Sequence, residues 1–165
     1  MLRLPALLLI LAVGALQTAR TVKGRYRHPG QGFSIMVPSE ATGLLDGDPA
    51  IERGIRLLLP SGGSIFVYGE ANSLEWPAPV DGIRWAAAQE PTCSSQGIRN
   101  ERVGKLSGSG VRLSCGETSI RLLLVFRPGG GPIYWLRLET ASAREAEDAI
   151  LLERVAASFQ TIPWR

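Results

Sequence analysis

Histidine and cysteine are scarce in this chain of 165 residues, which contains one histidine, His28, and two cysteines, Cys93 and Cys115. Zinc sites are built mainly from these residue types, and Ser-His-Asp or Cys-His nucleophilic sites need a histidine base. His28 would have to act from a turn, directly before Pro29. We therefore expect no metal, no cofactor and no catalytic residue, and we interpret His28 as a turn residue at the start of the first strand.

Long apolar runs are also missing, because no run reaches the roughly 20 residues that a transmembrane helix needs. The apolar run at residues 4–16 follows Arg3 and precedes polar residues, a pattern typical of a secretory signal peptide. We predict a signal peptide over residues 1–19, with Ala15 and Ala19 as candidate cleavage points. The mature protein is then periplasmic or secreted, with no stable membrane span, and an uncleaved membrane anchor is the alternative.

Charge of one sign is not concentrated in any segment. The formal net charge is +3, and the basic residues are almost all arginines that are spread along the chain. Proteins that bind nucleic acids carry their positive charge as a patch or stripe. We therefore expect no nucleic-acid partner.

The two cysteines have a spacing that favours a structural disulfide. An even pair of cysteines in an exported chain is most simply a disulfide. Redox-active pairs usually have the spacing Cys-x-x-Cys, which Cys93 and Cys115 do not have. Closing the loop between them would stabilise the fold by roughly 3 kcal/mol in the chain-entropy model.

Hydrophobic periodicity predicts one α+β domain over residues 20–165. The expected architecture is an antiparallel β-sheet of about six to seven strands with two main helices packed on it, because runs of strands separated by isolated helices are typical of this class. The predicted strands are 33–37, 54–60, 64–70, 100–110 (a weak or edge strand), 111–115, 119–127 and 133–140. The segments predicted to be loops or turns are 21–32, 38–53, 61–63, 72–80, 92–100, 108–110 and 128–132.

Two helices are predicted, the first over residues 78–90. The second begins at Ser142, which forms a predicted capping box with Glu145 and thereby satisfies free amides of the first turn. Residues at helical spacing form its predicted buried face. These are Ala149, Leu152, Ala156 and Phe159, flanked by Ile150 and Val155.

The opening of the predicted domain carries a recognisable pattern. Its residues are Tyr26, Pro29, Gly32, Phe33, Ser34, Ile35 and Pro38, and the late helix ends in the sequence LERVAASF at 152–159. This pattern resembles the PsbP-like family and also small uncharacterised bacterial periplasmic proteins. The resemblance implies an exported α/β sandwich, and it supplies no catalytic residues because the members are functionally diverse.

A proline-flanked tryptophan marks the candidate binding surface, in the loop at residues 70–79. Tryptophan and arginine are enriched in binding hot spots. The tentative binding residues are Tyr68, Glu75, Trp76, Trp85, Trp135 and Arg137. In the alternative interpretation, Trp76 caps an edge of the core and Trp135 packs under a helix.

The sequence thus favours a non-catalytic binding or accessory module of the cell envelope, whose partner is an unidentified envelope protein or ligand. One alternative is a small periplasmic hydrolase that uses the carboxylates of Glu70, Glu75 and Asp81. Another is an inhibitor or immunity-type protein. A calcium loop at Asp46 and Asp48 is disfavoured, because calcium needs six or more oxygen ligands and only Glu52 is near.

Overall fold

The computed structural model describes residues 20–45 and 54–163. The predicted signal peptide and the residues of the disfavoured calcium loop, Asp46, Asp48 and Glu52, lie outside the described residues. Within them, no helix is long and apolar enough to cross a membrane.

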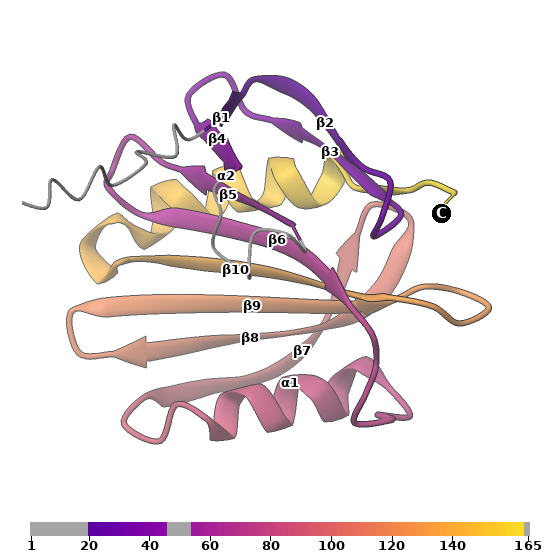
Figure 1. The fold of residues 1–165 in the computed structure, drawn as a ribbon. Coiled ribbons are helices and arrows are strands. Elements are labelled where there is room, and N and C mark those ends of the chain that lie inside the picture. The colour runs from indigo at the N-terminus through magenta and orange to yellow at the C-terminus, as the bar shows by residue number, and fades with distance from the viewer. Residues whose placement is uncertain (1–19, 46–53, 164–165) are drawn as a thin grey trace, which may run out of the picture.

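A large antiparallel sheet of eight strands forms the centre of the molecule (Figure 1), with the strand order β1-β4-β5-β6-β10-β9-β8-β7. Its strands are β1 (Arg20–Val22), β4 (Thr42–Leu45), β5 (Gly54–Leu58), β6 (Ser64–Glu70), β7 (Ser94–Val103), β8 (Leu106–Cys115), β9 (Thr118–Phe126) and β10 (Ile133–Ala141). A smaller antiparallel sheet has the order β11-β3-β2. Its strands are β2 (Gly24–His28), β3 (Phe33–Val37) and β11 (Gln160–Thr161).

The two main helices lie on opposite faces of the large sheet. Helix α1 (Pro79–Ala88) packs on β8 and β9, and helix α2 (Glu145–Ser158) packs on β10 and β3. The α2 face carries the main core, in which β3 and α2 bury apolar residues against β5, β6 and β10. The α1 face carries a second core centred on Ile83, Leu122 and Leu124.

The α+β class and the antiparallel sheet are confirmed, but the strand count is higher than predicted. Strands β1, β2, β4 and β7 occupy segments that were expected to be loops or, in part of β7, a weak edge. Strands β1 and β7 lie at the two edges of the large sheet. An edge strand is held by its backbone ladder and can be polar on both faces, so hydrophobic periodicity does not detect it.

The predicted turn at residues 108–110 is wrong, because Gly108 and Gly110 lie inside β8. A Cβ atom on Gly110 would lie 2.7 Å from Cγ of Glu101 and 2.8 Å from Cδ2 of Leu123. Glycine is therefore present here because neighbouring side chains approach the strand closely.

The predicted capping box is also wrong. Residues Ser142–Arg144 form a short 3₁₀ helix, labelled η2, and neither helix N-terminus there has a side-chain cap. The hydroxyl of Ser142 instead donates to the carbonyl of Gly116 at 3.3 Å, and the Glu145 carboxylate contacts Arg112. Helix α2 is rotated slightly from the predicted face, so Leu151 is buried while Ile150 is 52% exposed.

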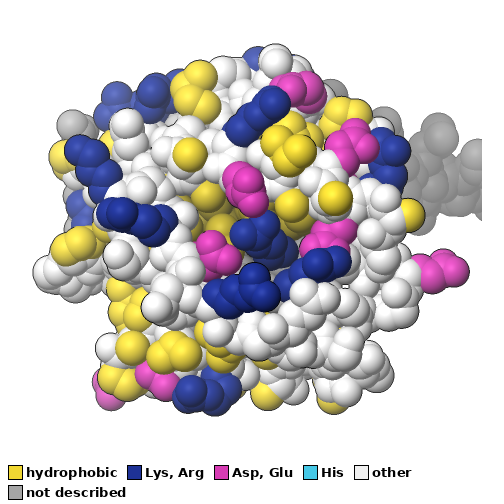
Figure 2. Space-filling view, turned by 180° about the vertical axis from the view of Figure 1, so that it is seen from behind, with side chains coloured by type: hydrophobic (Ala, Val, Ile, Leu, Met, Phe, Trp, Pro, Cys, Tyr) yellow, Lys and Arg dark blue, Asp and Glu magenta, His cyan; other side chains and the backbone are white. Residues whose placement is uncertain are grey.

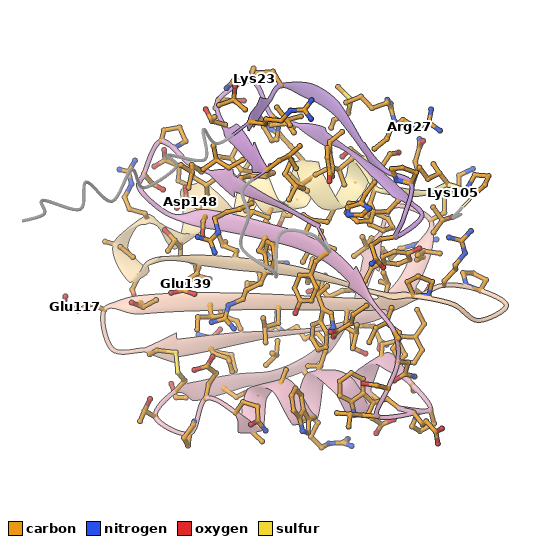
Figure 3. The ribbon with its side chains drawn as sticks, in the orientation of Figure 1. Lys23, Arg27, Lys105, Glu117, Glu139 and Asp148 are labelled. Carbon is orange, nitrogen blue, oxygen red and sulfur yellow. A yellow bond between two sulfur atoms is a disulfide. The ribbon has the colours of Figure 1, made fainter. Side chains whose placement is uncertain are left out.

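Cys93 and Cys115 form the predicted disulfide (Figure 3), which joins the segment after α1 to the end of β8. His28 is the last residue of β2, where its Nδ1 accepts a hydrogen bond from the Gln31 amide at 3.1 Å. Its ring stacks on Phe33 with a centroid distance of 5.6 Å. These contacts give His28 a structural role in the turn between β2 and β3.

Candidate functional site

Two neighbouring strands present the aromatic residues at the centre of the site. Strands β6 and β10 are hydrogen-bonded antiparallel, and their register places Tyr68 directly opposite Trp135. The two rings stack, with centroids 6.4 Å apart and an interplanar angle of 16°. Phe66 extends this row, since its ring stacks on Tyr68 at 4.7 Å. The row lies on the α1 face of the sheet.

The segment before α1 holds Trp76 against this row. The Trp76 amide donates to Oδ1 of Asn72 at 3.0 Å, and Nδ2 of Asn72 donates back to the Trp76 carbonyl at 2.9 Å. The Trp76 ring then meets Trp135 edge-on at 6.0 Å. Glu75 has a φ of 52°, a left-handed conformation rare for residues other than glycine, and its side chain is exposed.

Helix α1 supplies the outermost aromatic residue, Trp85. Its ring lies 5.6 Å from Trp76 and is 47% exposed. The helix approaches this closely because residue 82 is glycine. A Cβ atom on Gly82 would lie 2.4 Å from Cδ2 of Leu124 and 2.8 Å from Cε3 of Trp76.

Charged side chains border the aromatic row. The indole Nε1 of Trp135 donates to Oε1 of Glu70 at 2.7 Å, which fixes the orientation of the buried ring. Arg137, two residues further along β10, forms ion pairs with Glu90 at 3.3 Å and Glu139 at 3.2 Å. Figure 3 labels Glu139, which marks the outer end of this charged border.

These elements line an open cavity of about 150 Å³, which we call the aromatic cavity. It is lined by Tyr68, Glu70, Trp85, Ala86, Gln89, Glu90, Leu122, Trp135 and Arg137. Sites for whole small molecules usually have volumes of roughly 300–1,000 Å³. The cavity therefore fits a single projecting side chain of a partner better than a complete metabolite. Aromatic walls and a charged border suit a side chain with an apolar body and a polar end.

The structure brings together most of the residues predicted for the site. Tyr68, Trp85, Trp135 and Arg137 line the cavity, and Trp76 supports it through its contacts with Trp85 and Trp135. Glu75 does not line it. Trp135 is buried beside α1, as the alternative interpretation expects, whereas Trp85 is exposed.

Sequence reasoning missed Ala86, Gln89, Glu90 and Leu122 as lining residues. The spacing of Trp85 and Gln89 could have indicated that both side chains lie on the same side of the helix, since residues four apart share a helix face. Leu122 had no such signal, because its place depends on the register of β9 against β10.

The three carboxylates named for a hydrolase do not all line this cavity. Of Glu70, Glu75 and Asp81, only Glu70 lines the aromatic cavity. Asp81 forms an ion pair with Arg84 at 3.0 Å, and Glu75 is exposed. Among the described residues, no group of three or more histidine, cysteine, aspartate or glutamate side chains is placed to hold a metal ion.

No family model matches the chain. No curated protein matches its sequence.

Solved structures do resemble the chain. The solution structure of cyanobacterial PsbP (CyanoP) from Synechocystis aligns with 16% identity over 92% of this chain and 98% of that chain, with a TM-score of 0.57. A crystal structure from Bacteroides thetaiotaomicron aligns with 17% identity over 84% of this chain and 48% of that chain, with a TM-score of 0.50. Sequence identities this low support a similar fold and no further property. The chain has the PsbP-like fold, as the opening pattern of its sequence predicted.

Proposed function

We propose that the mature protein is an exported, non-catalytic accessory module of the cell envelope, and that its α1 face binds a partner protein through the aromatic cavity. One observation carries this proposal: Trp85 is 47% exposed at the rim of a cavity that also holds the stacked rings of Tyr68 and Trp135. Exposed tryptophans beside arginine are typical of binding hot spots.

Export is supported by two features of the chain. The apolar run at residues 4–16 follows Arg3, in the pattern of a signal peptide. The disulfide between Cys93 and Cys115 is of a kind that persists in oxidising compartments.

The rigidity of the site supports binding to a preformed surface. Trp135 is fixed by its hydrogen bond to Glu70, and Trp76 is fixed by both of its bonds to Asn72. Side chains that are already ordered lose little conformational entropy when a partner docks. Trp85 is then the main side chain to become buried on association.

Affinity capture from an envelope extract of the source organism tests the proposal. The bait would be the mature, oxidised protein, compared with Trp85→Ala and with Ile150→Ala, which removes an equally exposed apolar side chain from α2. We expect one partner to be retained by the wild type and by Ile150→Ala, and to be lost with Trp85→Ala. A partner retained equally by all three baits would contradict the proposed face.

A further inference from the structure

A second cavity lies on the opposite, α2 face of the sheet. It has a volume of about 270 Å³ and opens between the first turns of α2 and the strands β7, β8 and β9. Its lining includes Arg99, Arg112, Arg121, Glu101, Glu145 and Gly110. Figure 2 shows this face, where basic and acidic side chains gather around a hollow near the middle. We call it the arginine groove.

The three arginines come from three adjacent strands. Arg112 of β8 stands directly opposite Arg121 of β9 in the strand register, and Arg99 of β7 stands opposite Gly110 of β8. Like charges directly opposite each other in an antiparallel pair destabilise the sheet. The register therefore places two guanidinium groups side by side, with a third arginine on the next strand.

Acidic side chains orient two of these guanidinium groups without using all of their donors. Arg121 forms ion pairs with Glu101 at 3.4 Å and Glu153 at 3.3 Å, and Arg112 forms one with the buried Glu145. A guanidinium has five N–H donors, so donors remain available. Among the described residues the Arg99 side chain makes no ion pair or hydrogen bond, and it is exposed.

Gly110 lines the groove, and the side chains of Glu101 and Leu123 pack closely over it. A Cβ atom there would lie within 3.0 Å of Glu101, Leu123 and the Leu122 carbonyl. At the rim, β7 has a register irregularity between Ser95 and Ile98, within which Gly97 has a φ of 87°. Bulges of this kind change the direction of side chains and are over-represented beside functional sites.

We propose that the arginine groove binds the oxyanion of a small ligand, as a phosphate or carboxylate group. Arginine presents paired donors that match the geometry of both groups. Arg112 and Arg121 are paired with acidic side chains, so the guanidinium of Arg99 supplies the unpaired positive charge that a ligand would meet. The volume is close to the lower end of the range for small-molecule sites, which fits a short ligand.

Chemical-shift titration of the ¹⁵N-labelled mature protein tests this proposal. Inorganic phosphate and succinate would be added separately, with ionic strength held constant by sodium chloride. We expect saturable shifts of backbone amides in residues 97–101, 110–112 and 145–146. The anion with the tighter dissociation constant identifies which oxyanion the groove prefers.

Two matched substitutions separate a specific site from general charge attraction. Arg99→Gln removes a groove arginine, and Arg102→Gln removes an exposed arginine three residues further along β7, on the other face of the sheet. We expect Arg99→Gln to weaken binding roughly tenfold, the usual worth of a charge-assisted hydrogen bond, and Arg102→Gln to change it less than about twofold. Shifts that do not saturate with either anion, or equal weakening by both substitutions, would overturn the proposal.

Discussion

The two faces of the large sheet are covered to different extents. On the α2 face, a helix and a second sheet cover the strands, and residues such as Phe33, Tyr134 and Leu152 are fully buried. On the α1 face, a single short helix packs on β8 and β9, and the row from Phe66 to Tyr68 is left half-buried. The larger buried core therefore lies on the α2 face, and the α1 face is the one on which we have proposed partner binding.

Strand β10 contributes side chains to both faces of the sheet. Tyr134, Leu136 and Leu138 point into the α2-side core, while Trp135 belongs to the α1-side core and Arg137 lies at the cavity. Because side chains alternate along a strand, a shift of one residue in the strand register would move each of these side chains to the opposite face. The pairing of β10 with both β6 and β9 fixes the register on each side.

The largest expected effect comes from opening the α2-side core. Phe33 is fully buried and stacks on Phe159 at 5.7 Å, with Tyr134 edge-on at 5.9 Å. We expect Phe33→Ala to lower the free energy of unfolding by about 3–5 kcal/mol, measured by urea denaturation. Trp85→Ala should cost less than about 1 kcal/mol, because much of that ring is already in water. Similar decreases in the free energy of unfolding for the two variants would contradict the larger role of the α2-side core in stability.

The disulfide is expected to have the next largest effect. It joins Cys93 to Cys115 across a sequence separation of 22 residues. The double variant Cys93→Ser/Cys115→Ser should lose about 3 kcal/mol, because the unfolded chain regains the entropy of an open loop. Thermal unfolding of the variant, compared with the wild type before and after reduction, measures this. A wild type whose stability is unchanged by reduction would contradict the prediction.

A buried carboxylate ties α2 to the sheet. Oδ2 of Asp148 accepts hydrogen bonds from the hydroxyls of Ser61 at 2.6 Å and Thr140 at 2.5 Å. Figure 3 labels Asp148, which joins α2 to the β5–β6 turn and to β10. We expect Asp148→Ala to lower the free energy of unfolding by about 2 kcal/mol, because two hydroxyls lose a charged acceptor.

The matched control for Asp148→Ala is Glu153→Ala, since Glu153 lies on the same helix with an exposed side chain. That change should cost well under 1 kcal/mol, because exposed ion pairs contribute little. If urea denaturation gave equal decreases in the free energy of unfolding for the two variants, the hydrogen bonds of Asp148 would contribute no more to stability than an exposed ion pair.

The last effect concerns tyrosine ionisation on the α2 side, and it is confined to high pH. Burial raises the pKa of Tyr26 from 10.0 to about 12. The unfolded state therefore loses this proton first, so stability falls as pH rises from about 10 to about 12. An absorbance titration of tyrosinate should show a component near pH 12 that disappears in Tyr26→Phe. A wild-type curve complete by about pH 11, with no difference in the variant, would contradict this assignment.

The apolar parts of the fold could be predicted from the sequence. The strand at 64–70 has the predicted bounds, and helix α1 lies within the predicted 78–90, because both have clear hydrophobic periods between Gly or Pro breakers. The exposed β7 could not be predicted as a full strand, because its pairing depends on backbone bonds to β8 rather than on its side chains. The capping box failed because Glu145 pairs with Arg112 of a distant strand.

Four of the six candidate binding residues line the cavity, but its geometry could not be predicted. Aromatic and proline content pointed to Trp76 and its neighbours, whereas the stacking of Tyr68 on Trp135 follows from the pairing of β6 with β10. That pairing joins segments far apart in the sequence, and it is set by the order of strands in the whole sheet. Glu90 was missed for the same reason, since its partner Arg137 lies on β10.

Site-specific photo-crosslinking in living cells tests most directly the claim that the α1 face binds a partner. A photoreactive phenylalanine derivative would replace Gln89, an exposed residue that lines the cavity beside Trp85, in one strain and the exposed Ile150 of α2 in another. We expect one crosslinked species of defined mass from position 89 and none from position 150. Equal crosslinking from both positions, or crosslinking from position 150 alone, would contradict the division of the two faces.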